Sequence, residues 1–179
     1  AAALLKRLAK PERNMLIDLI DNESKRDIAM LESFDEDEIG SRMSMNFIEI
    51  KAGISIREAM RELVAQAAEN DNISTLYVTD EQHTFCGAID LKDLIIAREG
   101  SSLDDIIMES YPYVYAREMI EDCIERMKDY SEDSIPVLDE NNKILGVITA
   151  QDIVQVVDDE MGDDYAKLAG LASEEELNE

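Results

Sequence analysis

The sequence predicts an α+β protein in which a short all-α helical array precedes two copies of a strand-helix-strand-strand-helix unit and an acidic C-terminal helix. Three observations support this prediction. Apolar residues recur every three or four positions up to Met43 and then change to the shorter period of strands. The strand-and-helix pattern next appears twice, and carboxylates crowd the region after Val157.

Residues 1–44 form the predicted helical array. Apolar pairs such as Met15 and Leu19 lie one helical turn apart, as expected for short amphipathic helices. Because the pattern is already helical at Ala1, we expect these residues to be the C-terminal part of a longer helical domain.

Residues 45–106 form the first predicted unit. It opens with a short strand at Phe47, and a capping box formed by Ser55 and Glu58 begins an amphipathic helix. The remaining elements are strands at Leu76–Val78 and Phe85–Ile89 and a helix at Leu91–Ala97.

Residues 107–157 repeat this order. Many residues correspond at a shift of 59, such as Gly87 with Gly146 and Asp93 with Asp152, and the shift over the preceding helix is 64. So many matches in one register indicate an internal duplication. We expect the two copies to pack against each other across equivalent faces.

The composition excludes several function classes. Forty-two Asp and Glu residues against 17 Lys and Arg give a net charge of −25, which repels nucleic acid and anionic lipid. Such a charge forms either a solvated surface or a sink for cations. No apolar run approaches the roughly 20 residues of a membrane helix, and no secretory signal is found. Cys86 and Cys123 are expected to be free core thiols.

No catalytic constellation is found. His83 is the only histidine, and it lies in a polar turn without a nucleophile beside it. The sequence contains no zinc-ligand spacing, P-loop or dinucleotide fingerprint. We therefore expect a regulatory module and not an enzyme.

The stretch Gly146-Val-Ile-Thr-Ala-Gln-Asp152, which follows a strand and a polar turn, resembles the second half of a CBS domain, so the two copies resemble a tandem CBS pair. The junction Glu38-Ile-Gly-Ser-Arg-Met43, together with the helices before it and the acidic helix, resembles the cytosolic part of MgtE-type magnesium transporters. In that family the acidic plug helix leads into the pore. Residues 158–179 resemble its start, which implies a transmembrane pore domain as partner and a position at the cytoplasmic face of the cell membrane.

Candidate magnesium ligands concentrate after the second unit. Magnesium takes oxygen ligands and keeps several waters, so one or two carboxylates can hold it. Glu160, Asp163 and Asp164 share one helical face and repel each other unless a cation is present, although a solvated helix surface is the alternative. The candidate metal ligands are Glu121, Asp152, Asp158, Asp159, Glu160, Asp163 and Asp164.

The resemblance supports four of these positions, namely Glu121, Asp152, Glu160 and Asp163. Ser131 and Gln155 stand where the family has carboxylates. The nearby Asp129, Glu132 and Asp133 are alternatives for the missing ligands.

A second candidate ligand is ATP or another adenine nucleotide. Thr149 and Asp152 match the residues that contact phosphates and ribose in CBS domains. The first unit has Asp90 and Asp93 there, and the added carboxylate of Asp90 should repel phosphate. The alternative is that Thr149 and Asp152 only cap the helix that follows.

The leading hypothesis is a magnesium sensor that gates a magnesium transporter or channel, with ions bridging acidic residues in the closed state. The rival is an adenine-nucleotide-sensing CBS module that regulates an enzyme domain. We also expect a homodimer formed through helices such as Leu91–Ala97 and Ile120–Met127, because each unit has an apolar helix face to cover.

Overall fold

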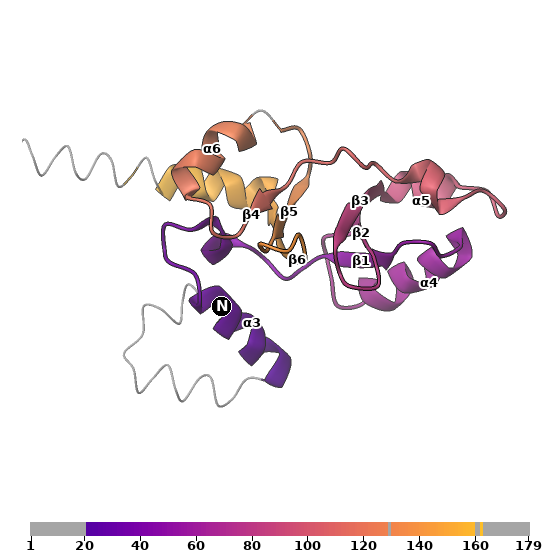
Figure 1. The fold of residues 1–179 in the computed structure, drawn as a ribbon, viewed down its shortest axis with the longest axis horizontal. Helices are drawn as coiled ribbons and strands as arrows, with labels where there is room; N and C mark the ends of the chain where they lie inside the picture. The colour runs from indigo at the N-terminus through magenta and orange to yellow at the C-terminus, as the bar shows by residue number, and fades with distance from the viewer. Residues whose placement is uncertain (1–20, 129, 160–161, 163–179) are drawn as a thin grey trace, which may run out of the picture.

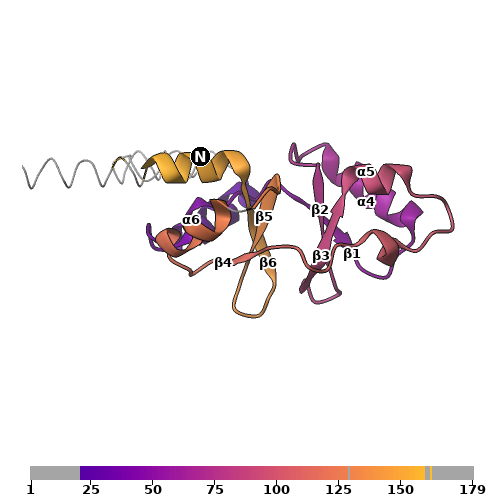
Figure 2. The same cartoon turned by 90° about the horizontal axis from the view of Figure 1, so that it is seen from above.

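The structure is a computed structural model that describes residues 21–128, 130–159 and 162. Two three-stranded sheets lie next to each other in the middle of the molecule, with helices at both ends (Figures 1 and 2). This arrangement confirms the predicted α+β class with two copies of one unit. Helix α3 (Asn22–Glu32) belongs to the predicted N-terminal array, and residues 1–20 of that array lie outside the described residues.

Both sheets have the same topology. In each, the first strand runs parallel to the central strand and the third runs antiparallel to it. A bulge falls at the same place in both, between Val78 and Thr79 and between Val137 and Leu138. The strands are β1 (Ile48–Lys51), β2 (Thr75–Thr79) and β3 (Phe85–Asp90) in one sheet, and β4 (Val114–Tyr115), β5 (Ser134–Leu138) and β6 (Ile144–Thr149) in the other. The shared register confirms the internal duplication.

Each sheet is covered by the helices of its own unit, which are α4 (Ile56–Ala67) and α5 (Leu91–Ile96) in the first unit, and α6 (Ile120–Lys128) and the helical residues 150–159 in the second. Helix α4 begins at the predicted capping box. The Glu58 amide donates to Ser55 Oγ at 3.2 Å, and the Ser55 amide donates to Glu58 Oε2 at 2.9 Å. Ala59 and Leu63 of this helix are buried against the sheet.

The central strand of each sheet is buried on both faces. Every residue of β2 and of β5 is buried, and the face that its own helices leave open is covered by the other unit. Tyr77 lies at this interface, where its hydroxyl is hydrogen-bonded to Ser134 Oγ. The Tyr111 hydroxyl donates to the Ser134 carbonyl at 2.7 Å, and burial raises the pKa of Tyr111 to about 12.

The two hairpin turns meet each other symmetrically. His83 and Asn142, which are 59 residues apart, both have positive φ, at 64° and 61°. The Phe85 amide donates to the Asn142 carbonyl at 2.8 Å, and the Ile144 amide donates to the His83 carbonyl at 3.4 Å. An approximate twofold axis therefore relates the units, and His83 is a turn residue as predicted.

Each unit also extends an arm onto the other. The first arm, residues 39–44, begins with the 3₁₀ turn Ile39–Arg42 and lies on the second unit. The Ser44 amide donates to the Val147 carbonyl at 2.8 Å, and the Val147 amide donates back to the Ser44 carbonyl at 2.9 Å.

The second arm, residues 103–108, begins with the 3₁₀ turn Leu103–Ile106 and lies on the first unit. The Met108 and Ala88 amides donate to each other's carbonyls at 2.7 and 3.1 Å. These two residues are the duplication equivalents of Ser44 and Val147, so the exchange of arms obeys the same twofold relation.

Glycines allow the first arm to lie this close to the second unit. A Cβ on Gly146 would be 2.8 Å from the Ser44 carbonyl oxygen, and a Cβ on Gly40 would be 2.8 Å from the Ala116 carbonyl oxygen. A methyl group at either position would push the arm away, because the opposing atom belongs to the backbone.

We expect Gly146→Ala to destabilise the protein by about 1–3 kcal/mol, the usual cost of overpacking. Urea unfolding measures this change. Gly162→Ala is the matched control, because a Cβ there has no heavy atom within 4 Å and Ala favours the helix. Equal stability of the two variants would contradict the close packing of the arm.

Candidate functional site

A cavity of about 600 Å³ lies between the two units and is lined by residues of both. Its charged lining residues are all carboxylates, namely Asp90, Glu109, Glu132 and Asp133. One carboxylate oxygen of Glu132 is buried without a hydrogen-bond partner. Because no lysine or arginine is found among the described residues that line it, the cavity repels phosphate groups.

The duplication places neutral residues at the equivalent positions on the other side of the twofold axis. The equivalents of Asp90, Glu109, Glu132 and Asp133 are Thr149, Met45, Ile73 and Ser74. The surroundings of Thr149 therefore lack the four carboxylates of the first cavity. Two equivalent positions of one fold thus differ sharply in charge.

Thr149 and Asp152 form a capping box at the start of the C-terminal helix. The Asp152 amide donates to Thr149 Oγ1 at 3.1 Å, and the Thr149 amide donates to Asp152 Oδ2 at 3.0 Å. This is the geometry of the capping alternative. Asp90 has a similar role in the first unit, where it accepts from the Lys92 amide at 2.8 Å and caps α5.

Two of the candidate metal ligands lie together on the C-terminal helix. Asp158 and Asp159 are exposed, and Asp159 Oδ2 is 2.9 Å from Arg42 Nη1 on the first arm. The other candidates on this helix, Glu160, Asp163 and Asp164, lie outside the described residues, as does Asp129.

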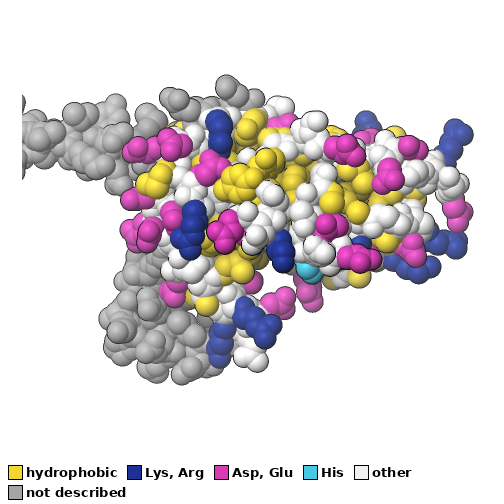
Figure 3. Space-filling model, viewed as in Figure 1, with side chains coloured by type: hydrophobic (Ala, Val, Ile, Leu, Met, Phe, Trp, Pro, Cys, Tyr) yellow, Lys and Arg dark blue, Asp and Glu magenta, His cyan; other side chains and the backbone are white. Residues whose placement is uncertain are grey.

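The described carboxylates are dispersed. Glu121 is exposed in the first turn of α6, and Asp152 is engaged in the cap. Within residues 21–128, 130–159 and 162, no three Asp, Glu, His or Cys side chains are close enough to hold one metal ion. On the face drawn in Figure 3, acidic side chains are likewise scattered over both units.

The only histidine belongs to a polar cluster that sequence reasoning missed. Glu49 Oε1 is 2.8 Å from His83 Nδ1 and 3.0 Å from Lys51 Nζ. Burial opposes ionisation of Glu49, but hydrogen bonds from Thr79, His83 and Lys51 hold its pKa below the usual value. The sequence signal was the alternation in β1, which places Glu49 and Lys51 on one face of the strand.

The cysteine prediction is correct in part. Cys86 and Cys123 are both free thiols. Cys123 is buried as expected, but Cys86 is exposed because it lies near the start of β3, on the strand's open side. No described helix has the length and apolar character needed to cross a membrane.

Comparisons with known proteins agree with a fold of two similar units. The model of the CBS domain family matches residues 37–100 and 103–159. Magnesium transporter MgtE of Enterococcus faecalis is 33% identical over 86% of this chain, and that of Thermus thermophilus is 29% identical over 87%. The chain spans about a third of the length of these relatives, 34% and 35% respectively.

Two solved structures are similar over most of the chain. The soluble part of a magnesium transporter is 31% identical with a TM-score of 0.82, covering 89% of this chain and 62% of that one. The cytosolic domain of the Mg²⁺ channel MgtE in complex with ATP is 28% identical with a TM-score of 0.79, covering 87% and 64%.

The cap predicts the effect of changing Thr149. Thr149→Ala should lower the free energy of unfolding by about 0.5–2 kcal/mol without any added ligand, because the Asp152 amide loses its acceptor. Thr149→Ser keeps the hydroxyl and should stay close to wild type. Urea unfolding in EDTA compares the variants, and a stability unchanged by the alanine would rule out the capping role.

Proposed function

This chain belongs to the CBS domain family, its CBS pair is homologous to the cytosolic domain of MgtE magnesium transporters, and on this premise we propose that it is a magnesium-sensing module that gates a magnesium transporter or channel. The likeness to the soluble part of a magnesium transporter carries the proposal. It covers 89% of the chain and so extends beyond the two CBS units. The same homology supports a regulatory role without catalysis.

Electrostatic repulsion is the proposed source of the response. The chain has a net charge of −25, and its C-terminal helix leaves the second unit with Asp158 and Asp159 exposed. Magnesium ions that bridge carboxylates of different segments would offset this repulsion and favour a closed state. Moving a two-state equilibrium from 1:99 to 99:1 takes roughly a 10⁴-fold preference, which several weak sites can supply together.

The partner of this module is proposed to be its own transmembrane pore domain. The acidic helix would connect the second unit to that domain, and the module would lie at the cytoplasmic face of the cell membrane. Closure of the module would then shut the pore.

An adenine nucleotide is the second proposed ligand, since a similar cytosolic domain was solved with ATP. The Thr149 side keeps the Asp152 carboxylate but has neutral residues in place of the four carboxylates of the cavity beside Asp90, so it repels phosphate less than that cavity does. A nucleotide sensor for an enzyme domain is the rival function. The acidic C-terminal helix favours the magnesium sensor, because nucleotide binding does not require it.

Millimolar magnesium should raise the melting temperature and reduce the radius of gyration, because ions that bind the closed form stabilise it by mass action. Sodium at matched ionic strength should do less, since it screens charge but does not bridge carboxylates. Replacing Asp152, Glu160 and Asp163 together should reduce the magnesium response. Asp152→Asn is used with Glu160→Gln and Asp163→Asn, because the amide oxygen of Asn can preserve the cap.

The matched control removes three exposed carboxylates elsewhere, with Glu69→Gln, Glu81→Gln and Glu140→Gln. It makes the same change in net charge and should keep the wild-type magnesium response. Melting curves and small-angle scattering over a magnesium titration compare the three proteins. Equal responses in all three would place the bound ions elsewhere.

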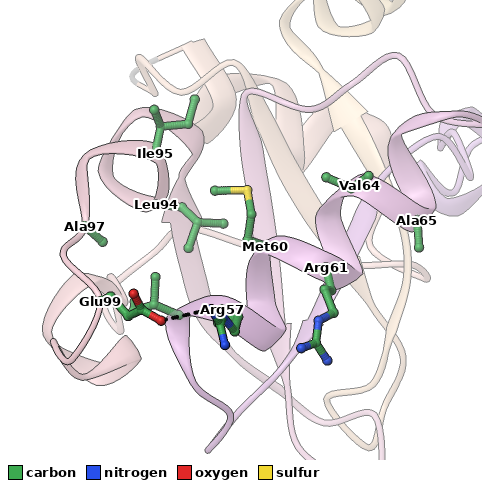
Figure 4. Close-up of a pocket in the computed structure, with 10 residues that line it drawn as sticks. Arg57, Met60, Arg61, Val64, Ala65, Leu94, Ile95, Ala97 and Glu99 are labelled. Atoms are coloured by element: carbon green, nitrogen blue, oxygen red, sulfur yellow. Dashed lines mark ion pairs between the residues drawn. The ribbon is translucent and has the colours of Figure 1, made fainter.

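An apolar groove supports the proposed homodimer. A groove of about 760 Å³ runs between α4 and α5, where Met60 and Leu94 lie between the helices (Figure 4). Val64 and Ile95 are 67% and 61% exposed beside it. Val154, the duplication equivalent of Ile95, is 62% exposed in the second unit. Both units thus present an uncovered apolar residue at the same helix position. A second copy of the chain could cover these residues in a symmetric dimer.

We expect a dimer in light scattering at micromolar concentration. Ile95→Arg combined with Val154→Arg should shift the protein toward the monomer, because each change places a charge in the apolar contact. Gln82→Arg in an exposed turn is the control and should remain dimeric. A monomeric wild type, with and without magnesium, would contradict the proposal.

A further inference from the structure

Arg42 joins two segments that are far apart in the sequence. Its Nη1 atom is 2.9 Å from Asp159 Oδ2, and the two side chains are 34% and 48% exposed. Within the part of the chain that the structure describes, no other lysine or arginine forms an ion pair with the C-terminal helix. The first arm therefore supplies a cation to residues 150–159 of that helix, whose own charged side chains are all carboxylates.

The backbone around Arg42 is held firmly on the second unit. Upstream, the Ile39 and Gly40 amides donate to the Glu118 and Ala116 carbonyls at 2.9 and 2.8 Å. Downstream, Ser44 is bonded to Val147 in both directions. Because its chain is fixed on both sides, the guanidinium is presented to the helix from a defined position.

We propose that Arg42, at the contact between the first arm and the C-terminal helix, holds this helix on the second unit when divalent cations are scarce. We propose also that it competes with magnesium for Asp159. The holding role stands on the ion pair alone, whereas the competition rests on the proposed function. Arg42 is a positioning residue in the first role. In the second it tunes the magnesium concentration at which the module responds.

The competition follows from charge. A carboxylate that accepts from a guanidinium is partly neutralised, so a magnesium ion must displace Arg42 or share the carboxylate with it. Exposed pairs of this kind shift an equilibrium by about 1.4- to fivefold. By linkage, removal of Arg42 should lower, by a similar factor, the magnesium concentration at which Asp159 is half occupied by the ion.

Hydrogen exchange of the helical amides within residues 153–159 tests the holding role in EDTA. Arg42→Ala should speed exchange about 1.4- to fivefold relative to α4, and Asp159→Asn should do the same. The double variant should exchange no faster than either single variant, because both remove one interaction. Additive effects, or no effect of Arg42→Ala, would overturn the holding role.

A magnesium titration of the same amides tests the competition. Arg42→Ala should double its own EDTA level of protection at about 1.4- to fivefold lower magnesium than wild type needs to double its level, and Arg61→Ala, which removes an exposed arginine from α4, should not change this midpoint. A midpoint unmoved by Arg42→Ala would overturn the competition. Absence of any magnesium protection in wild type would overturn both the competition and the proposed function, while the EDTA result would still decide the holding role.

Discussion

The structure depends on the burial of two central strands, β2 and β5, along their whole lengths. A three-stranded sheet with helices on one side leaves its other face open to water. In this chain that face carries Tyr77 in one unit and Ser134 in the other, and the two side chains meet. Neither unit can bury its central strand alone. The reciprocal hairpins and the exchanged arms both follow from the twofold packing that covers these faces.

The local features could be predicted from the sequence. The Ser55 cap and the turn at His83 depend on residues that lie close together in the chain, and the duplication shows as a repeated residue pattern. The structure has all three. The arm exchange could not be predicted, because Ser44 meets Val147 through backbone bonds that leave no side-chain pattern. At the site, sequence reasoning identified Thr149 with Asp152 and offered both a ligand and a cap as roles. It missed Arg42, whose partner is 117 residues away.

The duplicated units have kept one backbone and diverged in charge. On one side of the twofold axis four carboxylates line a cavity, and on the other their equivalents are Thr, Met, Ile and Ser. The two sheets keep the same topology although the charge differs at these four matched positions. A duplicated fold can therefore carry different charges at equivalent positions without changing its architecture.

The exchange of arms determines how mechanical force passes through the molecule. The chain reaches the second unit first, through residues 39–44, then crosses to build the first unit, and finally returns to complete the second unit and leave along the C-terminal helix. The incoming and outgoing segments are thus anchored on the same body. A force applied between helix α3 and the C-terminal helix would act on the second unit and on the Arg42 contact. The first unit would bear little of this force, because both segments are anchored on the second unit. Motion in the first unit can reach the outgoing helix through the contacts between the units, which are the interface around Tyr77, the paired hairpin turns and the exchanged arms.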